Sequence, residues 1–194
     1  EVKITDMATV YGVLANGGHR VDLNPISKIP DSQGNTLEEK KDPPAGGQKI
    51  ALAPGAAFII SDILADNNAR AMAFGTRSPL IIPKHVVSVK TGTSDNKRDN
   101  WAFGYTPSFL VAVWVGNNDN SPMSQSLASG ITGAAPIWNK IMTKLLDNSF
   151  SENISIPQNV IRKPCLGRLE YFIKGTENSV NCIFKPTPTP TPKK

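Results

Sequence analysis

The stretch Val86-Val87-Ser88-Val89-Lys90-Thr91-Gly92-Thr93 decides the fold of this 194-residue chain. Residues 86–90 are β-branched or extended, which is typical of a strand. Two further strand-like runs follow at Asp99–Tyr105 and Phe109–Gly116, and the three residues between them suffice for a hairpin. We therefore predict three consecutive antiparallel strands with Asp99–Tyr105 in the middle. In the last run, one face carries three valines and the other Ala112 and Trp114.

Helices are predicted before and after this sheet. An apolar face predicts a helix over about Thr5–Ala15, with Thr5 as its N-cap. Asn16-Gly17-Gly18 ends this helix. Pro54 suits the first turn of a second helix that runs to about Asp66. A last helix opens at Ala134-Ala135-Pro136 and ends near Asn148. Its spacing predicts a face buried against the sheet, made by Ile137, Ile141, Met142 and Leu145.

The remaining segments have the composition of loops and tails. Residues 19–37 predict an irregular surface hairpin with a turn at 31–35, and 42–47 predict a loop. We divide the chain into a main portion, 1–148, a tail segment, 149–185, and an extended, disordered Thr-Pro repeat, 186–194. The two cysteines of the tail segment are expected to bracket a short hairpin around Gly175.

Composition excludes several classes of function. The net charge of +5 is modest, and its lysines and arginines are scattered, which disfavours nucleic-acid binding. No run of eighteen apolar residues occurs, so any membrane attachment or targeting segment is expected outside this chain. The basic surface would suit an anionic cell envelope, but a solvated surface without a partner is the favoured interpretation.

Cys165 and Cys182 lie close together with no CxxC pattern around them, so zinc is disfavoured and we predict no metal or other cofactor. A disulfide between them would imply an oxidising, extracytoplasmic compartment. Two unpaired thiols are the alternative.

Lys90-Thr91-Gly92-Thr93 is the most informative tetrapeptide, because Lys-Thr-Gly on a strand is typical of penicillin-binding proteins and serine β-lactamases. Further patches match in order, and the chain resembles the C-terminal part of the transpeptidase domain of class A, bifunctional penicillin-binding proteins. These patches are Ala8–Gly18, Asp99–Pro107, Val113–Gly116 with Asp119, Gly133–Trp138, and Phe172–Glu177 leading to Cys182. The resemblance implies a partial α/β (α+β) domain of the transpeptidase and β-lactamase type, a mainly antiparallel sheet flanked by helices.

The resemblance also implies roles for the tetrapeptide. Lys90, Thr91 and Thr93 match the cation and hydroxyl donors that hold the terminal carboxylate of a substrate peptide along the strand edge. Gly92 would let the backbone approach closely, and the amide N–H of Thr93 would be one donor of the oxyanion hole. A solvated strand end is the alternative for these four residues.

The catalytic serine of the family is missing from this chain. The Ser-x-x-Lys and Ser-x-Asn motifs precede Lys-Thr-Gly in the family, and neither occurs before residue 90. Ser94-Asp95-Asn96-Lys97 matches Ser-x-x-Lys, but it follows the strand in a polar, turn-like stretch. Ser151-Glu152-Asn153 and Ser179-Val180-Asn181 match Ser-x-Asn only in the tail. The chain alone is therefore expected to be inactive, because it has no nucleophile.

Weaker candidates receive structural interpretations. His19 and His85 are isolated from other catalytic residue types, and Asp62 and Asp66 at an i, i+4 spacing predict a solvated helix face. The three tryptophans are Trp101, Trp114 and Trp138. For at least two of them, packing in the core is favoured over lining a substrate groove.

We therefore expect the substrate-binding half of a serine D,D-transpeptidase, which cross-links peptidoglycan stem peptides and is acylated by β-lactams. The expected partners are the stem peptide, β-lactams and the remaining N-terminal half of the domain, at the extracytoplasmic face of the bacterial cytoplasmic membrane. Alternatives are a noncatalytic binding or assembly module of the same fold and a serine β-lactamase. The length of the chain beyond Gly116 disfavours the β-lactamase.

Overall fold

The computed structural model describes residues 2–41, 48–124 and 129–183. Its centre is an antiparallel sheet in the order β3-β4-β5. The strands are β3 (Ser88–Thr93), β4 (Asp99–Tyr105) and β5 (Leu110–Gly116). The predicted α+β class and the central position of residues 99–105 are confirmed. The predicted loop 42–47 and the Thr-Pro repeat 186–194 lie outside the described residues.

Strand β3 contains the whole Lys90–Thr93 tetrapeptide, whereas the sequence predicted a strand ending at Lys90. Thr91 pairs with Ala102, Gly92 with Trp101, and Thr93 with Asn100. Pairing with β4 therefore keeps these residues extended beyond the point where local preference ends. The following short helix η1 (Asp95–Lys97) forms the turn into β4.

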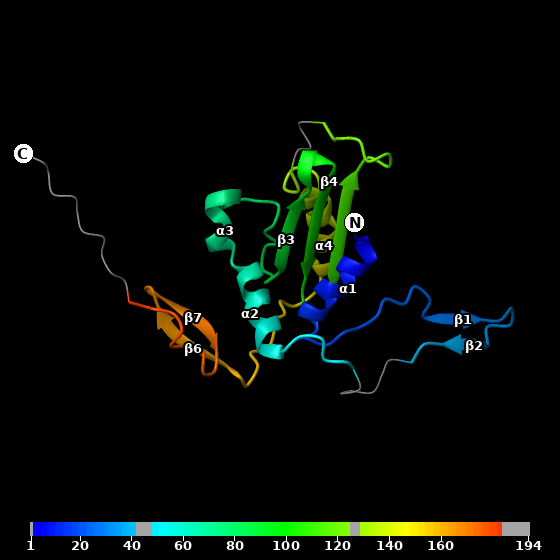
Figure 1. Cartoon of the computed structure of the whole chain (residues 1–194). Coiled ribbons are helices and arrows are strands. Elements are labelled where there is room, and N and C mark those ends of the chain that lie inside the picture. The colour runs from blue at the N-terminus through cyan, green and yellow to red at the C-terminus, as the bar shows by residue number, and fades with distance from the viewer. Residues whose placement is uncertain (1, 42–47, 125–128, 184–194) are drawn as a thin grey trace, which may run out of the picture.

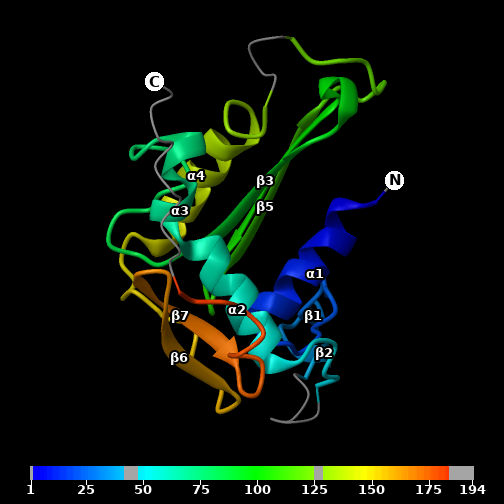
Figure 2. The ribbon, with the colours of Figure 1, turned by 60° about the vertical axis from the view of Figure 1, so that its left-hand side comes forward.

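Helices cover both faces of the sheet. Helix α1 (Ile4–Ala15) lies on one face and α4 (Ala134–Leu146) on the other, while α2 (Pro54–Ala65) lies beside β3 (Figures 1 and 2). The predicted N-cap of the first helix is wrong. Lys3 occupies the cap position, and no side chain closes it with a hydrogen bond.

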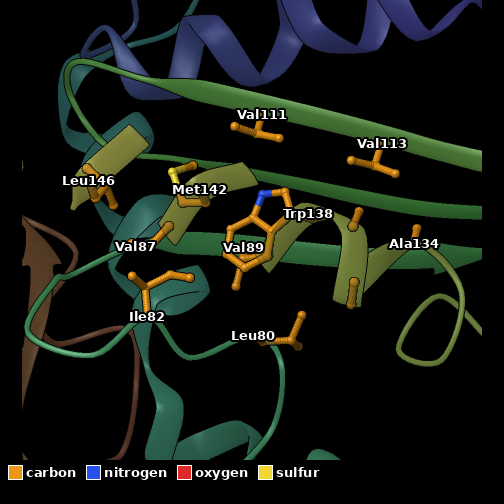
Figure 3. Packing of buried hydrophobic residues seen from close by; sticks show 12 residues of the cluster. Leu80, Ile82, Val87, Val89, Val111, Val113, Ala134, Trp138, Met142 and Leu146 are labelled. Carbon is orange, nitrogen blue, oxygen red and sulfur yellow. The ribbon is translucent and has the colours of Figure 1, made fainter. Parts of the chain in front are cut away.

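The main core lies between the sheet and α4. Trp138, Met142 and Leu146 project from α4 towards Val111 and Val113 of β5 (Figure 3). The predicted buried face of this helix is thus largely wrong: Met142 is buried, but three of its four members are exposed, namely Ile137, Ile141 and Leu145. The helix carries two adjacent apolar stripes, and the three-stranded sheet covers only one of them.

Gly104 allows β4 and α4 to pack closely. A Cβ atom there would lie 2.3 Å from Cζ2 of Trp138, far inside van der Waals contact. Trp138 is 0% exposed, and its ring lies over the backbone of Gly104. The glycine is therefore required by space, and it determines where the largest core side chain lies.

A short helix that the sequence did not predict follows α2. Helix α3 (Asn67–Phe74) is capped by Asp66, whose carboxylate accepts hydrogen bonds from the N–H groups of Asn68 and Ala69 at 2.9 Å each. Asp66 also pairs with Arg168 of the tail at 3.2 Å. This carboxylate therefore has a structural role and does not merely face solvent.

The tail forms a hairpin of β6 (Val160–Cys165) and β7 (Arg168–Ile173). Its turn is at Leu166 and Gly167, both with positive φ, so the predicted hairpin around Gly175 is wrong. Gly175 lies instead in the turn that follows β7. A disulfide joins Cys165, the last residue of β6, to Cys182. The ring of Tyr171 meets that of Phe58 edge-on at 4.9 Å, which attaches the hairpin to α2.

The predicted surface hairpin is present between α1 and α2. Its strands, β1 (Lys28–Pro30) and β2 (Thr36–Glu39), are fully exposed and project from the body of the protein (Figure 1). Asp31 orders the turn by accepting hydrogen bonds from the N–H groups of Gln33 and Asn35, each at 2.8 Å.

Candidate active site

Among the residues that the structure describes, the tetrapeptide lies on an outer strand, because β3 pairs with β4 alone. Ser88 and Val89 are buried, whereas Lys90 and Thr93 are exposed and the two residues between them are half-buried. The structure therefore brings the four predicted site residues together on one accessible strand edge.

The direction of each backbone group in β3 follows from one contact. Arg70 of α3 donates from Nη1 to the carbonyl of Val89 at 3.1 Å, from outside the sheet. Residues of an antiparallel strand alternate between facing the partner strand and facing away. Thr91 and Thr93 therefore also face outwards, and the N–H of Thr93 points to the open edge.

Lys90 and Gly92 border a pocket of about 380 Å³ on the sheet face that α1 covers in part. Aromatic rings floor this pocket: Tyr11 stacks on Phe103 at 4.7 Å, and Trp101 stacks on Phe103 at 5.7 Å. The ammonium of Lys90 donates a hydrogen bond to the carbonyl of Thr91. A cation and an open strand edge thus meet at the rim of an apolar pocket.

A second pocket of about 310 Å³ follows the outer edge of β3, between that strand and the segment α2–α3. Lys90 and Thr91 border it on one side, and Arg70 and Leu64 on the other. Arg70 also donates from Nη2 to the carbonyl of Leu64 at 2.6 Å. Arg70 therefore fixes the distance between the helices and the strand edge, a function that its sequence context did not reveal.

Asp99 closes the turn between β3 and β4. Its carboxylate accepts hydrogen bonds from Oγ of Ser94 at 2.6 Å and from Nε1 of Trp114 at 2.8 Å. These hydrogen bonds lower the pKa of Asp99 below its usual value. The bond from the Ser94 hydroxyl is the larger cause, and the bond from the Trp114 indole is the next. The charged carboxylate therefore stabilises the turn that follows the tetrapeptide.

Replacing Asp99 with asparagine is expected to destabilise the protein by about 1–2 kcal/mol at neutral pH, because it weakens charge-assisted hydrogen bonds. The folded pKa is lowered, so this contribution is present above the unfolded pKa of about 3.9 and is lost as pH falls through the folded pKa. Urea unfolding of both variants from pH 7 to pH 2.5 measures it. A difference that persists undiminished at pH 2.5 would contradict the assignment.

Ser94 is unsuited to the role of nucleophile, as its sequence context indicated. Its hydroxyl donates to the carboxylate of Asp99 and accepts the N–H of the same residue at 2.9 Å. The literal Ser-x-x-Lys match ends within the helix η1, in which Asn96 has a positive φ. Both lysine and serine thus belong to a tight turn.

The tryptophans divide differently from the prediction. Trp138 alone is fully buried, whereas Trp101 and Trp114 are half-buried and line surface pockets. The prediction that at least two pack in the core is therefore wrong. Among the described residues, no cluster of three histidine, cysteine or acidic side chains could hold a metal. His19 and His85 lie outside the pockets beside β3.

Comparison with known families decides the assignment. Residues 2–143 match the family described as the penicillin binding protein transpeptidase domain. The chain belongs to this transpeptidase family. Penicillin-binding protein 1A of Neisseria lactamica is 31% identical over 171 residues, which cover 87% of this chain and 20% of that protein. Penicillin-binding protein 1A of Clostridium botulinum is 31% identical over 158 residues, or 81% of this chain and 17% of that protein.

Solved structures agree on the transpeptidase fold. Penicillin-binding protein 1A from Haemophilus influenzae superposes with a TM-score of 0.74 at 24% identity, over 89% of this chain and 32% of that one. PonA1 from Mycobacterium tuberculosis, solved in complex with penicillin V, gives 0.65 at 23% identity, over 79% and 40%. The chain thus corresponds to part of the transpeptidase region of class A penicillin-binding proteins, and it spans 20% of the length of the first relative.

In the part of the chain that the structure describes, no helix is both long enough and apolar enough to span a bilayer.

Proposed function

We propose that this chain supplies the substrate-binding strand of a D,D-transpeptidase that cross-links peptidoglycan stem peptides by serine acyl transfer and is acylated by penicillin. The observation that carries the proposal is the open outer edge of β3, which presents the ammonium of Lys90, two hydroxyls and the outward N–H of Thr93. An extended peptide with a terminal carboxylate fits such an edge by β-strand addition.

Each group then has a chemical task. Lys90 and the hydroxyls of Thr91 and Thr93 hold the carboxylate of the stem peptide or the β-lactam. The N–H of Thr93 donates to the oxyanion that forms when the nucleophile attacks the scissile carbonyl. Gly92 leaves room beside the strand for the ligand backbone. The nucleophilic serine comes from polypeptide outside these 194 residues.

The remaining part of the transpeptidase domain is the proposed partner that brings this serine. Support comes from an apolar surface beside the edge of β5 that pairs with none of the described strands, where Ile137 and Ile141 are 45% and 43% exposed. Together with Ile4 and Trp114 they line a hollow of about 470 Å³. A strand and apolar side chains from the rest of the domain would cover this surface. We place the assembled enzyme at the extracytoplasmic face of the cytoplasmic membrane, anchored through a segment outside this chain.

Labelling with a fluorescent penicillin tests the function. The isolated chain is expected to form no covalent adduct, whereas the complete protein that contains it should be labelled on a serine outside these residues, identified by peptide mass spectrometry. In the complete protein, Lys90→Gln should slow labelling by at least about tenfold, because a charge-assisted contact to the carboxylate is lost. Lys84→Gln, at an exposed lysine outside the pockets beside β3, is the matched control.

Three results would contradict the proposal. An adduct on the isolated chain would show that a nucleophile is present after all. Failure of the complete protein to react would contradict the proposed acylation by penicillin. Rapid hydrolysis of penicillin over many turnovers would favour a β-lactamase.

A further inference from the structure

The turn that precedes α4 contacts the tetrapeptide from beneath the sheet. The backbone N–H of Gly130 donates a hydrogen bond to the hydroxyl oxygen of Thr93 at 2.9 Å. Gly130 is 37 residues away in the sequence, it is buried, and it has no place in the Lys-Thr-Gly pattern. The contact therefore joins the proposed ligand-binding strand to a segment that the sequence did not implicate.

This N–H is held in position by the turn and by α4. The N–H groups of Thr132 and Gly133 both donate to the carbonyl of Ser129 at 3.0 Å. The carbonyl of Gly130 accepts a hydrogen bond from Ala135 in the first turn of α4 at 2.8 Å. Because α4 is packed into the main core, the donor is fixed relative to the sheet.

Space allows only glycine at this position. A Cβ atom on Gly130 would lie 2.7 Å from the carbonyl oxygen of Gly92 and 2.9 Å from that of Trp101. It would also lie 3.1 Å from Cβ of Thr91. Backbone oxygens cannot move without displacing the strands, so a side chain here would push the turn away from β3.

We propose that Gly130 is a positioning residue for carboxylate recognition, an inference that rests on the proposed function. A threonine hydroxyl has one proton and two acceptor lone pairs. Since the N–H of Gly130 occupies one lone pair, the proton of Thr93 is directed away from the turn, towards the exposed edge of β3. An accepted hydrogen bond also strengthens the donor character of that hydroxyl. Gly130 thus orients Thr93 to donate to a ligand carboxylate.

The test compares acylation of the complete protein by a penicillin and by its methyl ester, which lacks the charged carboxylate. The ratio of the two second-order rate constants reports carboxylate recognition. We expect Gly130→Ala to lower this ratio by about three- to tenfold, the value of one oriented hydrogen bond, and Thr93→Val by about tenfold or more. Thr93→Ser, which keeps the hydroxyl, should preserve it. In the double variant, Gly130→Ala should add little to Thr93→Val.

Gly55→Ala is the matched control, because its Cβ would crowd the side chain of Asn159 at 2.9 Å and not the tetrapeptide or the turn before α4. It should leave the ratio unchanged. If Gly130→Ala does not fold, Thr132→Val replaces it, since Thr132 is exposed and its hydroxyl donates to the carbonyl of Ser129 at 3.1 Å within the turn. A ratio about threefold lower would then support the inference, as one weakened hydrogen bond predicts.

An unchanged ratio in the variant that folds, or equal slowing of both compounds, would make Gly130 merely structural and overturn its role. Failure of the wild-type protein to react with either compound would instead overturn the proposed function, and this inference with it.

Discussion

Replacing Thr93 with proline is expected to slow acylation of the complete protein by penicillin by about 10²–10³-fold, the usual effect of losing one oxyanion donor. Proline has no N–H, and its ring is tolerated on an outer strand where that group faces away from the partner. Because Thr93 faces outwards from β3, its pairing with Asn100 should survive. The acylation rate with fluorescent penicillin measures the loss, and far-ultraviolet circular dichroism measures retention of the fold.

Thr93→Val is the control that separates the backbone from the side chain. It keeps the N–H and loses the hydroxyl, so it should slow the reaction with penicillin but spare the reaction with the methyl ester. The proline variant should slow both, because the oxyanion forms with either compound. A proline variant that reacts at nearly the wild-type rate would exclude the N–H of Thr93 from the oxyanion hole.

Replacing Trp138 with alanine is expected to lower the free energy of unfolding by about 3–5 kcal/mol, which is typical of removing a large aromatic side chain from a core. Trp138 is 0% exposed, and it packs where Gly104 leaves the backbone of β4 uncovered. The surrounding helix and strands are held by their own packing and would fill the resulting cavity only in part. Urea denaturation of the 194-residue chain, followed by circular dichroism, measures the change.

Ile137→Ala is the matched control for this variant, since Ile137 lies one residue away on α4 and is 45% exposed. It should change stability by less than about 1 kcal/mol, as is usual for exposed positions. Equal losses at both positions would mean that α4 packs on the sheet through the stripe that the sequence predicted.

That stripe illustrates the limits of periodicity. Both Ile137 and Trp138 belong to apolar rows at helical spacing, and a helical pattern identifies apolar rows without stating which one meets the sheet. The choice depends on the width of the sheet and on the gap at Gly104. Helix α3 was missed for a related reason, because the capping role of Asp66 is evident only when the N–H groups of Asn68 and Ala69 are in place.

The candidate site was largely accessible from the sequence, because Lys90–Thr93 combines a recognisable motif with a strand-like context. The supporting residues were not. Arg70 and Gly130 reach the tetrapeptide through tertiary contacts, and nothing in their local sequence distinguishes them. Asp99 begins a patch that resembles the family, but its hydrogen bonds to Ser94 and Trp114 were not evident from the sequence. Side-chain chemistry can be read at one position, whereas the partner that orients it depends on how distant segments pack.

The sequence by itself determined the antiparallel order of strands β3 to β5, the approximate extents of α1, α2 and α4, and the residues of the proposed substrate-binding strand. These are set by local backbone preference and hydrophobic period, which act over a few residues. Only the tertiary structure decided that β3 extends to Thr93, that Thr93 faces the open edge, and that Gly130 lies beneath it. Strand ends that depend on pairing, and close backbone contacts, arise from packing between segments far apart in the chain, so no local pattern specifies them.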